Sequence, residues 1–231
     1  MQKNVKGIVK ALRSLGSPEV IQGMARYGIR SAKVYGVSVG TLREFAKEIG
    51  KDHELAGKLW ATGILDARIL AAFVEVPARV TETQMDRWAR GFDNWAICDG
   101  CCLHLFDKTP FAWKKAVQWA TRKEEFVKRG AFSLMALLAV HDKKAHDREF
   151  LRLLPIIKKA ASDERNGVKK AVNWALRQIG KRNRFLNNAA IRTAEAIRKS
   201  DSRAPRWIAA DALRELKSEA VQSRLKKKER V

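Results

Sequence analysis

The sequence predicts an all-α protein built as a curved solenoid of two-helix repeats. Three observations lead to this fold class. Apolar residues recur at the spacing of an α-helix along most of the chain, and glycine and proline stand between these segments. No run of alternating β-branched residues, of the kind that forms a strand, interrupts the pattern. Short helices are therefore expected to follow one another closely.

Fourteen helices are expected, and proline marks several of their ends. Pro18 opens the second helix, Pro77 follows the fifth, Pro110 precedes the eighth and Pro205 lies at the start of the thirteenth. Pro155 falls inside the tenth, where a proline can kink a helix. The expected ranges are 3–15, 18–27, 39–49, 52–62, 65–76, 81–90, 94–106, 111–121, 123–140, 146–161, 165–179, 184–199, 204–216 and 218–229.

Taken in pairs, these helices recur at about 35 to 45 residues, which is the spacing of two-helix solenoid repeats. Each repeat in such a stack buries its apolar face against its neighbours, so residues 1–231 are expected to form a single domain. One helix of each pair then lines a concave face. Because the chain from Asp163 onward holds 19 Lys and Arg against 8 Asp and Glu, this face is expected to be basic. Residues 225–231 are expected to be a frayed basic tail.

The charge of the chain indicates the class of its partner. It has 47 Lys and Arg against 25 Asp and Glu, a formal net charge of +22. Such a surface neutralises phosphates and releases their counterions, which favours DNA or RNA over an acidic membrane. No signal peptide and no membrane-spanning run is recognised. We therefore expect a cytoplasmic protein, associated with the nucleoid when bound to DNA.

Three cysteines, Cys98, Cys101 and Cys102, lie within five positions, with His104 nearby. Cys98 and Cys101 have the spacing of a metal-binding pair. Four-coordinate zinc needs a second pair of ligands, however, and the other histidines lack partners at a suitable spacing. We therefore expect buried, reduced thiols, and no metal or other cofactor.

The segment FDNWAICDG, residues 92–100, places Trp95 and Asp99 one helical turn apart on one face. Asp93 and Asn94 precede them as candidates for the helix cap. Spacing alone leaves two interpretations open. Either Trp95 packs in the core while Asp99 pairs with a nearby arginine at the surface, or the two side chains work as a unit.

A second segment, AVNWALRQIGKRN, aligns Trp174 with Lys170, Arg177 and Lys181 on one helical face. An aromatic ring among cations suits nucleic acid, because the cations hold phosphates while the ring stacks on a sugar or base. A solvated face with a core tryptophan is the alternative, and Trp207 is equally ambiguous. Core positions are expected for Trp60, Trp88, Trp113 and Trp119.

Common catalytic motifs are missing from the sequence. It has no phosphate-binding glycine loop, no HExxH, no GxSxG and no close Cys/His pair. An enzyme with this sequence would need a catalytic site made of fewer groups than these motifs supply. A carboxylate flanked by aromatic rings on a DNA-binding surface is one such arrangement.

Three segments in order, NWAICD, VKRGAFSLMA and KKAVNWALRQIGKRN, resemble the AlkD-like DNA alkylation repair glycosylases. The likeness runs from about Met24 to the final helices and implies a solenoid of HEAT-like repeats. It also implies an active site made of a Trp-x-x-x-Asp motif, a later arginine and the tryptophan of a WALR-type segment. These residues correspond here to Trp95, Asp99, Arg129 and Trp174.

The resemblance further implies the contacts with DNA. The segment MARYGIRSAKVYGVSVGTLR is similar to the part of the family that places an aromatic and a polar side chain near the DNA. Basic residues after the second tryptophan match the family's basic contacts. The residues expected at the DNA are Tyr27, Ser38, Lys128, Lys170, Arg177, Lys181 and Arg182.

The chemistry that the resemblance implies is stabilisation of positive charge. A purine alkylated at N3 or N7 is cationic, and its departure leaves an oxocarbenium-like sugar. An ionised Asp99 offsets that charge, and the faces of Trp95 and Trp174 add to the effect. Arg129 holds a backbone phosphate and keeps Asp99 ionised. A monomer that releases 3-methyladenine or 7-methylguanine from double-stranded DNA, without extruding the base, is the leading expectation.

Two other functions remain open. One is a HEAT-repeat protein that binds damaged or branched DNA without turnover, for which tight, salt-sensitive binding without base release would be diagnostic. The other is a protein-binding scaffold, a common use of helical solenoids. The net charge of +22 makes the scaffold less favoured, because it does not suit an uncharged peptide partner.

Overall fold

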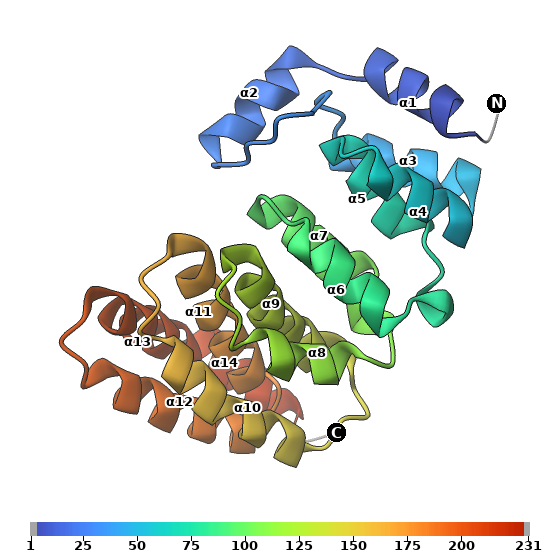
Figure 1. The fold of residues 1–231 in the computed structure, drawn as a ribbon. Coiled ribbons are helices and arrows are strands. Elements are labelled where there is room, and N and C mark those ends of the chain that lie inside the picture. The colour runs from blue at the N-terminus through green and yellow to red at the C-terminus, as the bar shows by residue number, and fades with distance from the viewer. Residues whose placement is uncertain (1–3, 229–231) are drawn as a thin grey trace. The chain divides into compact units, whose positions relative to one another are not determined.

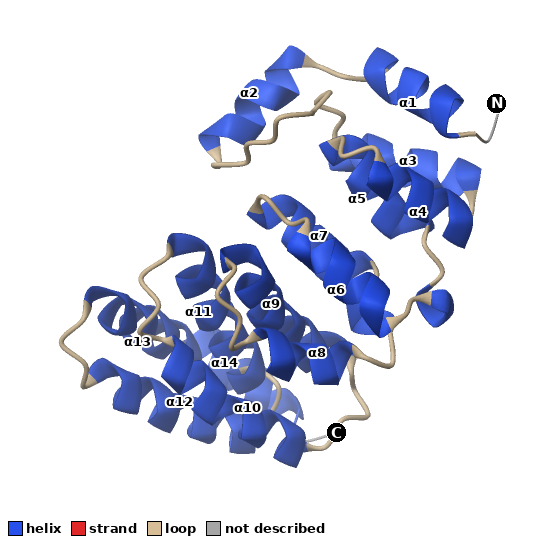
Figure 2. Cartoon of the chain, in the orientation of Figure 1, coloured by secondary structure: helices blue, strands red, loops and turns tan. Residues whose placement is uncertain are grey.

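The computed structural model describes residues 4–228, which form fourteen α-helices, two 3₁₀ turns and no strand (Figures 1 and 2). The all-α prediction is confirmed. The helices are α1 Val5–Ser14, α2 Pro18–Arg26, α3 Val39–Ile49, α4 His53–Ala61, α5 Leu65–Val74, α6 Glu82–Arg90, α7 Trp95–His104, α8 Ala112–Trp119, α9 Glu125–His141, α10 Asp147–Ala160, α11 Asn166–Gly180, α12 Arg184–Arg198, α13 Arg203–Leu216 and α14 Glu219–Lys228.

Local sequence signals account for the ends of many helices. Ser17, Asp52 and Thr81 are N-caps whose side chains accept a hydrogen bond from the first turn of α2, α4 and α6. Pro18 occupies the first helical position after Ser17, where a missing N–H costs nothing. Pro155 lies inside α10, which continues past it to Ala160.

The C-terminal end differs from the expected frayed tail. Residues up to Lys228 belong to α14, and Leu225 is fully buried. Lys228 Nζ donates hydrogen bonds to the backbone oxygens of Lys181 and Arg182. Burial of one apolar side chain and two tertiary hydrogen bonds hold this helix against the preceding ones. Residues 229–231 lie outside the described part of the chain.

The contacts divide the chain into two compact units, residues 1–110 and 111–231. The single domain and its basic concave face stay predictions. In the first unit α5 packs against α3 and α7, while α4 covers α5. Trp60 of α4 stacks on Trp88 of α6 with ring centroids 4.2 Å apart, and both are buried as expected. The stacked rings thus form a direct apolar contact between α4 and α6.

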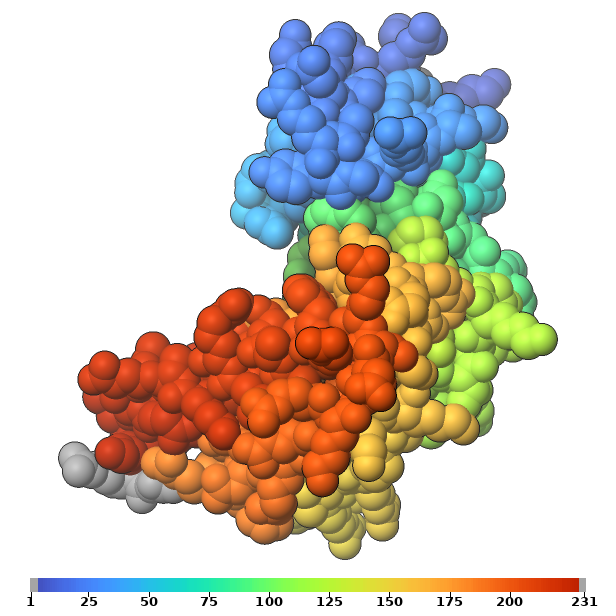
Figure 3. Space-filling view, turned by 90° about the vertical axis from the view of Figure 1, so that its left-hand side faces the viewer, coloured from blue at the N-terminus to red at the C-terminus, as the bar shows by residue number. Residues whose placement is uncertain are grey.

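In the second unit α9, α11 and α13 pack side by side in chain order, and α12 packs against α10, α11 and α13 (Figure 1). In the space-filling view, the yellow to red residues of this unit form one continuous surface (Figure 3). This is the packing expected of successive two-helix repeats, in which each repeat is buried against the next. Residues 131–139 of α9 are buried all round, so this stretch of α9 belongs to the core. Neither α9 nor any other described helix is long and apolar enough to span a membrane.

The two tryptophans of α8 differ in burial. Trp119 is buried as expected, whereas Trp113 is half-buried. The Trp113 indole Nε1 donates a hydrogen bond of 3.0 Å to the Asp142 carboxylate. Its polar edge thus reaches an acid just beyond α9, while its ring packs edge-on against Phe150.

A connecting segment, residues 27–38, is fixed to the first unit by one buried carboxylate. Asp66 is fully buried, and its two oxygens accept hydrogen bonds of 2.7 Å from the backbone N–H groups of Tyr35 and Val37. Gly36 has a φ of +82°, and a Cβ there would lie 2.4 Å from the Ser17 backbone oxygen. The segment that begins at Tyr27 is therefore anchored at its far end.

Candidate functional site

Trp95 is the first residue of α7 and is exposed to solvent. The side-chain oxygen of Asn94 caps the helix by accepting hydrogen bonds from the N–H groups of Ala96 and Ile97, at 3.0 and 3.2 Å. Trp95 retains 36% exposure, so the interpretation of Trp95 as a core residue is wrong. Asp93 does not cap the helix; it accepts a hydrogen bond of 2.8 Å from the Asn94 side chain.

The Trp95 indole is held by the segment that follows α2. Its Nε1 donates a hydrogen bond of 2.9 Å to the backbone oxygen of Tyr27. Tyr27 is the C-cap of α2, and 76% of its surface is exposed. Large exposed aromatic side chains often mark a binding surface, because water solvates their apolar faces poorly. The structure thus brings two predicted site residues, 68 positions apart, to one surface of the first unit.

Asp99 lies one helical turn beyond Trp95, about 6 Å further along the axis of α7. It is half-buried, whereas Cys102, further along α7, is fully buried, as is Phe106 in the 3₁₀ turn Phe106–Lys108 that follows the helix. Burial raises the pKa of the Cys102 thiol; a hydrogen bond with Cys98 opposes this rise, and the charge of Asp99 adds to it. Asp99 therefore stands at the boundary between the solvent-facing first turn and the core.

The three cysteines are buried and free of disulfides. Burial also raises the pKa of Cys101 well above its ordinary value. Both shifted thiols are thus protonated near neutral pH, which disfavours metal binding and nucleophilic chemistry. Among residues 4–228, no cluster of His, Cys, Asp and Glu has the geometry to hold a metal ion.

Ser38 is the N-cap of α3. Its hydroxyl accepts a hydrogen bond of 3.1 Å from the Thr41 N–H and lies 2.8 Å from the Thr41 hydroxyl. The side chain is exposed, so a ligand can reach this cap. Its task in the fold is to satisfy the first turn of α3.

Arg129 of α9 is buried, with 7% exposure. Its guanidinium Nη1 donates a hydrogen bond of 2.7 Å to the backbone oxygen of Gly167, in the first turn of α11. Glu125, one turn earlier on α9, accepts a hydrogen bond of 3.2 Å from the N–H of the same glycine. Arg129 and Glu125 thus bind the backbone oxygen and the backbone N–H of Gly167. These two hydrogen bonds hold the start of α11 against α9.

Lys128, next to Arg129, pairs with Asp163 at 2.9 Å. Arg165 also binds Asp163 through its Nε and Nη2, at 2.9 and 2.7 Å. The hydrogen bond from Arg165, followed by those of Lys128, holds the pKa of the Asp163 carboxyl well below its usual range despite partial burial. Lys128 is thus engaged with an acid of its own unit.

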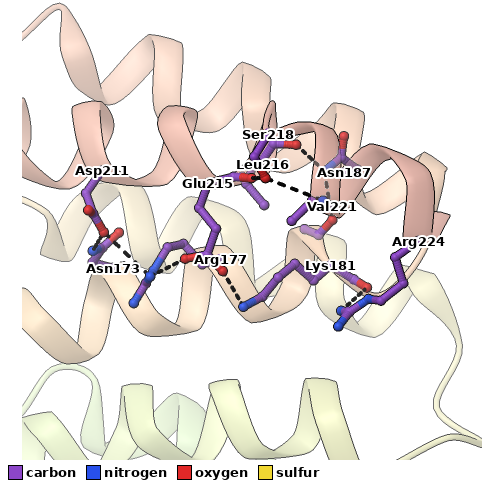
Figure 4. Close-up of polar contacts among 11 residues, drawn as sticks. Asn173, Arg177, Lys181, Asn187, Asp211, Glu215, Leu216, Ser218, Val221 and Arg224 are labelled. Atoms are coloured by element: carbon purple, nitrogen blue, oxygen red, sulfur yellow. Dashed lines mark hydrogen bonds and ion pairs between the residues drawn. The ribbon is translucent and has the colours of Figure 1, made fainter.

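The predicted basic stripe on α11 is largely paired with acids (Figure 4). Arg177 forms ion pairs with Glu215 and with Asp211 of α13, the latter at 3.6 Å. Lys181 also binds Glu215. Burial alone would raise the pKa of Glu215, but the hydrogen bond from Lys181 and the charges of Arg177 and Lys181 together lower it. Two of the predicted DNA contacts are therefore neutralised within the protein.

The rest of the stripe is open to solvent to different degrees. Lys170 is exposed, and Trp174 is half-buried on α11.

Arg182 lies just beyond α11. Its guanidinium donates hydrogen bonds to the backbone oxygens of Ala139 and Ala145, at 3.2 and 2.9 Å. It also stacks over the buried Phe150 ring at 4.4 Å. Arg182 joins α9, α10 and α11 and is thus part of the scaffold.

The predicted residues consequently fall into two groups. Trp95, Asp99 and Tyr27 belong to the first unit, whereas Arg129 and Trp174 belong to the second. Sequence reasoning missed the acids that neutralise the stripe on α11. The signal was present as Asp211 and Glu215, four positions apart on one face of α13, but pairing between distant helices cannot be read from spacing.

Comparison with known proteins places the chain in a family and identifies a similar fold. A family model described as "DNA alkylation repair enzyme" matches residues 8–216. A solved structure described as "A new family of proteins related to the HEAT-like repeat DNA glycosylases with affinity for branched DNA structures" is similar to this chain, with a TM-score of 0.78 and 22% identity. That match covers 96% of each chain, and it confirms the predicted HEAT-like fold. None of the curated proteins compared with the chain matches it.

Proposed function

Since the chain belongs to the DNA alkylation repair enzyme family, we propose that it is a monofunctional DNA glycosylase. It hydrolyses the N-glycosidic bond of cationic alkylated purines, of the 3-methyladenine and 7-methylguanine type, in double-stranded DNA. It works as a monomer and without extruding the base. The formal net charge of +22 supports DNA as the partner.

The observation that carries this proposal is the exposure of Trp95 one helical turn before Asp99 on α7. Trp95 is 36% exposed and fixed through its indole N–H, while Asp99 lies one turn behind it and half-buried. A ring face and a carboxylate are the two groups that a developing cation needs. The Asn94 cap fixes the first turn of α7, and the tertiary hydrogen bond fixes the Trp95 ring before DNA arrives, which reduces the ordering cost on binding.

The reaction needs little from the protein beyond electrostatics. The bond between C1′ of the sugar and the purine nitrogen breaks, and its electron pair goes to the purine, which leaves as a neutral base. Water then attacks C1′ of the oxocarbenium-like sugar and gives up one proton to solvent. Asp99 stabilises the positive sugar and orients this water, and the ring of Trp95 adds its face to the same charge. The family resemblance adds Trp174 as a second aromatic residue of the site.

Arg129 takes a different role in this proposal from the phosphate contact that the resemblance implies. Its 7% exposure and its hydrogen bond to Gly167 support a positioning role, in which it fixes the start of α11. The helix that carries Trp174 is thereby held in register with α9. Lys170, exposed on the same helix, is better suited to a phosphate.

Release of 3-methyladenine and 7-methylguanine from alkylated duplex DNA tests the function directly. Wild type should release both bases, and Asp99→Asn should slow release by about 100-fold or more, as loss of one electrostatic contact in a transition state typically does. Asp93→Asn is the matched control, because it removes the same charge just before α7, at a side chain that is 44% exposed. Equal rates for wild type and Asp99→Asn would refute the assigned role.

A second candidate is a HEAT-repeat protein that binds damaged or branched DNA without turnover. It is favoured by the similar solved structure, which is described by its affinity for branched DNA. The pairing of Arg177 and Lys181 with acids does not decide between the two. Tight, salt-sensitive binding to a four-way junction, together with no base release from alkylated duplex, would establish this alternative.

A further inference from the structure

The second unit contains a basic cleft, most of whose lining residues have no part in the proposed base release. Its volume is about 900 Å³, and it lies among the end of α9, the connection to α10, the end of α11 and the helix α14. Of the described residues that line it, one is acidic, Asp147. The basic residues of the cleft are Lys143, Lys144, Lys181, Arg182, Arg224 and Lys228. We call this set and the space between them the basic cleft.

Some of these cations have tasks in the fold. Arg182 binds the backbone oxygens of Ala139, Lys143 and Ala145, and Lys228 binds those of Lys181 and Arg182. Cations at helix C-termini satisfy carbonyls that have no partner within the helix. This structural use explains why Arg182 and Lys228 point inward. It does not account for the other cations.

Lys143 and Lys144 are exposed, and Arg224 is exposed with one long hydrogen bond of 3.4 Å to the Lys181 backbone oxygen. The acid of the cleft, Asp147, is bound by a neutral group, the Asn183 amide, at 2.9 Å to each oxygen. The cleft therefore carries a large excess of positive charge. Lys181 is shared with the stripe on α11 and is neutralised by Glu215 of α13. Lys143, Lys144 and Arg224 differ in this from the stripe.

The cations of the cleft repel one another. Burial lowers the pKa of Lys228, and the charges of Arg224, Lys143 and Arg182 lower it further. Like charges held together in a hollow are costly unless an anion joins them. A phosphate placed among them would relieve this repulsion and release counterions.

The lining also indicates which part of a nucleic acid would enter. No Phe, Tyr or Trp is found among the described lining residues, so bases lack the large rings on which they stack best. Ala139, Val140 and Ala145 give apolar patches against which a deoxyribose can lie. Gln178, one helical turn beyond Trp174 on α11, is also part of the lining. A strand lying at Trp174 would thus reach the cleft within a short distance.

We infer that the basic cleft binds the sugar–phosphate backbone of DNA outside the site of base release. The inference rests on the proposed DNA substrate but not on turnover. Backbone contacts of this kind position the protein on DNA and carry no sequence information. They lengthen the stretch of DNA that the protein covers and strengthen binding without touching the reacting sugar.

A charge-matched pair of variants tests this inference. The cleft variant carries Lys143→Gln, Lys144→Gln and Arg224→Gln, which leaves the hydrogen bonds of Arg182 and Lys228 in place. The control carries Lys159→Gln, Lys199→Gln and Lys226→Gln, three exposed lysines of the same unit that do not line the cleft. Both variants lose the same charge, so a difference between them reports position and not net charge. Thermal melting of both variants checks that they are folded.

Binding to unmodified linear duplex DNA is measured over a series of salt concentrations. Each lost phosphate contact should lower the slope of log affinity against log salt by about 0.9, so the cleft variant should lose about 2 to 3 in slope. The control should lose less than about 1 on the same scale. Equal slopes for the two variants would overturn the inference.

Two further measurements separate the outcomes. Calorimetry with inorganic tripolyphosphate measures whether the cleft binds a free anion. If the cleft variant loses tripolyphosphate binding but binds DNA as wild type does, the assignment of the cleft to DNA is overturned. Base release at saturating protein should be the same for the cleft variant and wild type, because the reacting sugar is elsewhere. Failure of wild type to release any base would count against the proposed function and leave the binding result intact.

Discussion

The indole Nε1 of Trp95 donates a hydrogen bond of 2.9 Å to the backbone oxygen of Tyr27. This bond joins the first turn of α7 to the C-terminal end of α2, and it restrains an exposed ring. A tryptophan at the surface without such a bond would sample several rotamers and lose that entropy on binding. The relationship therefore links the fold of the first unit to its proposed contact with DNA.

Trp95→Phe should keep an aromatic ring and lose this bond. We expect the free energy of unfolding to fall by about 1 kcal/mol, the typical net value of one hydrogen bond, and the affinity for duplex DNA to fall because the ring is no longer restrained. Chemical denaturation and DNA titration measure the two effects. Trp207→Phe is the control, since Trp207 is similarly exposed at 41% and its contact with Lys169 is a cation–π contact that phenylalanine retains. If both variants behave alike, the bond does not position the ring.

The secondary structure could be predicted from the sequence because its signals are local. Ser17 with Pro18, and Asn94 before Trp95, are caps that act within one turn. Site geometry depends on partners far away in the chain. Nothing in the segment NWAICD shows that Tyr27 accepts a bond from Trp95, and nothing near Arg177 shows that Glu215 faces it. The basic charge of residues 225–231 predicts a frayed tail, and charge alone does not reveal that Leu225 is buried.

Arg129→Lys should destabilise the second unit. Lysine cannot reproduce the planar guanidinium contact with the Gly167 backbone oxygen, and its charge would lie in a buried position shaped for arginine. We expect a loss of about 2 kcal/mol in unfolding free energy, the usual size for a hydrogen bond to a charged group. Arg192→Lys, at an exposed position on α12, should change stability little. A large loss of DNA affinity without a loss of stability would show that Arg129 contacts phosphate instead.

His104 should make the first unit less stable in acid. Burial, followed by the charges of Lys108, Arg43 and Lys51, lowers its pKa from 6.5 to about 4. The unfolded chain therefore binds a proton that the folded chain does not, and stability should fall as the pH drops from about 6.5 to about 4. Melting temperatures across this range measure the effect. His104→Phe, which preserves contact with the Phe73 ring at 4.4 Å, should flatten the profile.

Replacing an exposed histidine is the control for that profile. His146→Gln changes a residue that is exposed at the start of α10 and should leave the pH dependence of melting as in wild type. A profile that stays steep between pH 6.5 and about 4 in His104→Phe would assign the acid sensitivity to groups other than His104.

Glu215→Gln should strengthen binding to DNA. The Glu215 carboxylate neutralises Arg177 and Lys181, and its removal leaves their charge available to phosphates while a neutral amide of similar shape remains. We expect the slope of log affinity against log salt to become steeper by roughly 1, because about one more phosphate would be neutralised. Glu219→Gln, which removes an exposed acid at the start of α14, makes the same change in net charge elsewhere and should change the slope less. Weaker binding by Glu215→Gln would instead mean that the ion pairs hold Arg177 and Lys181 in the geometry that DNA requires.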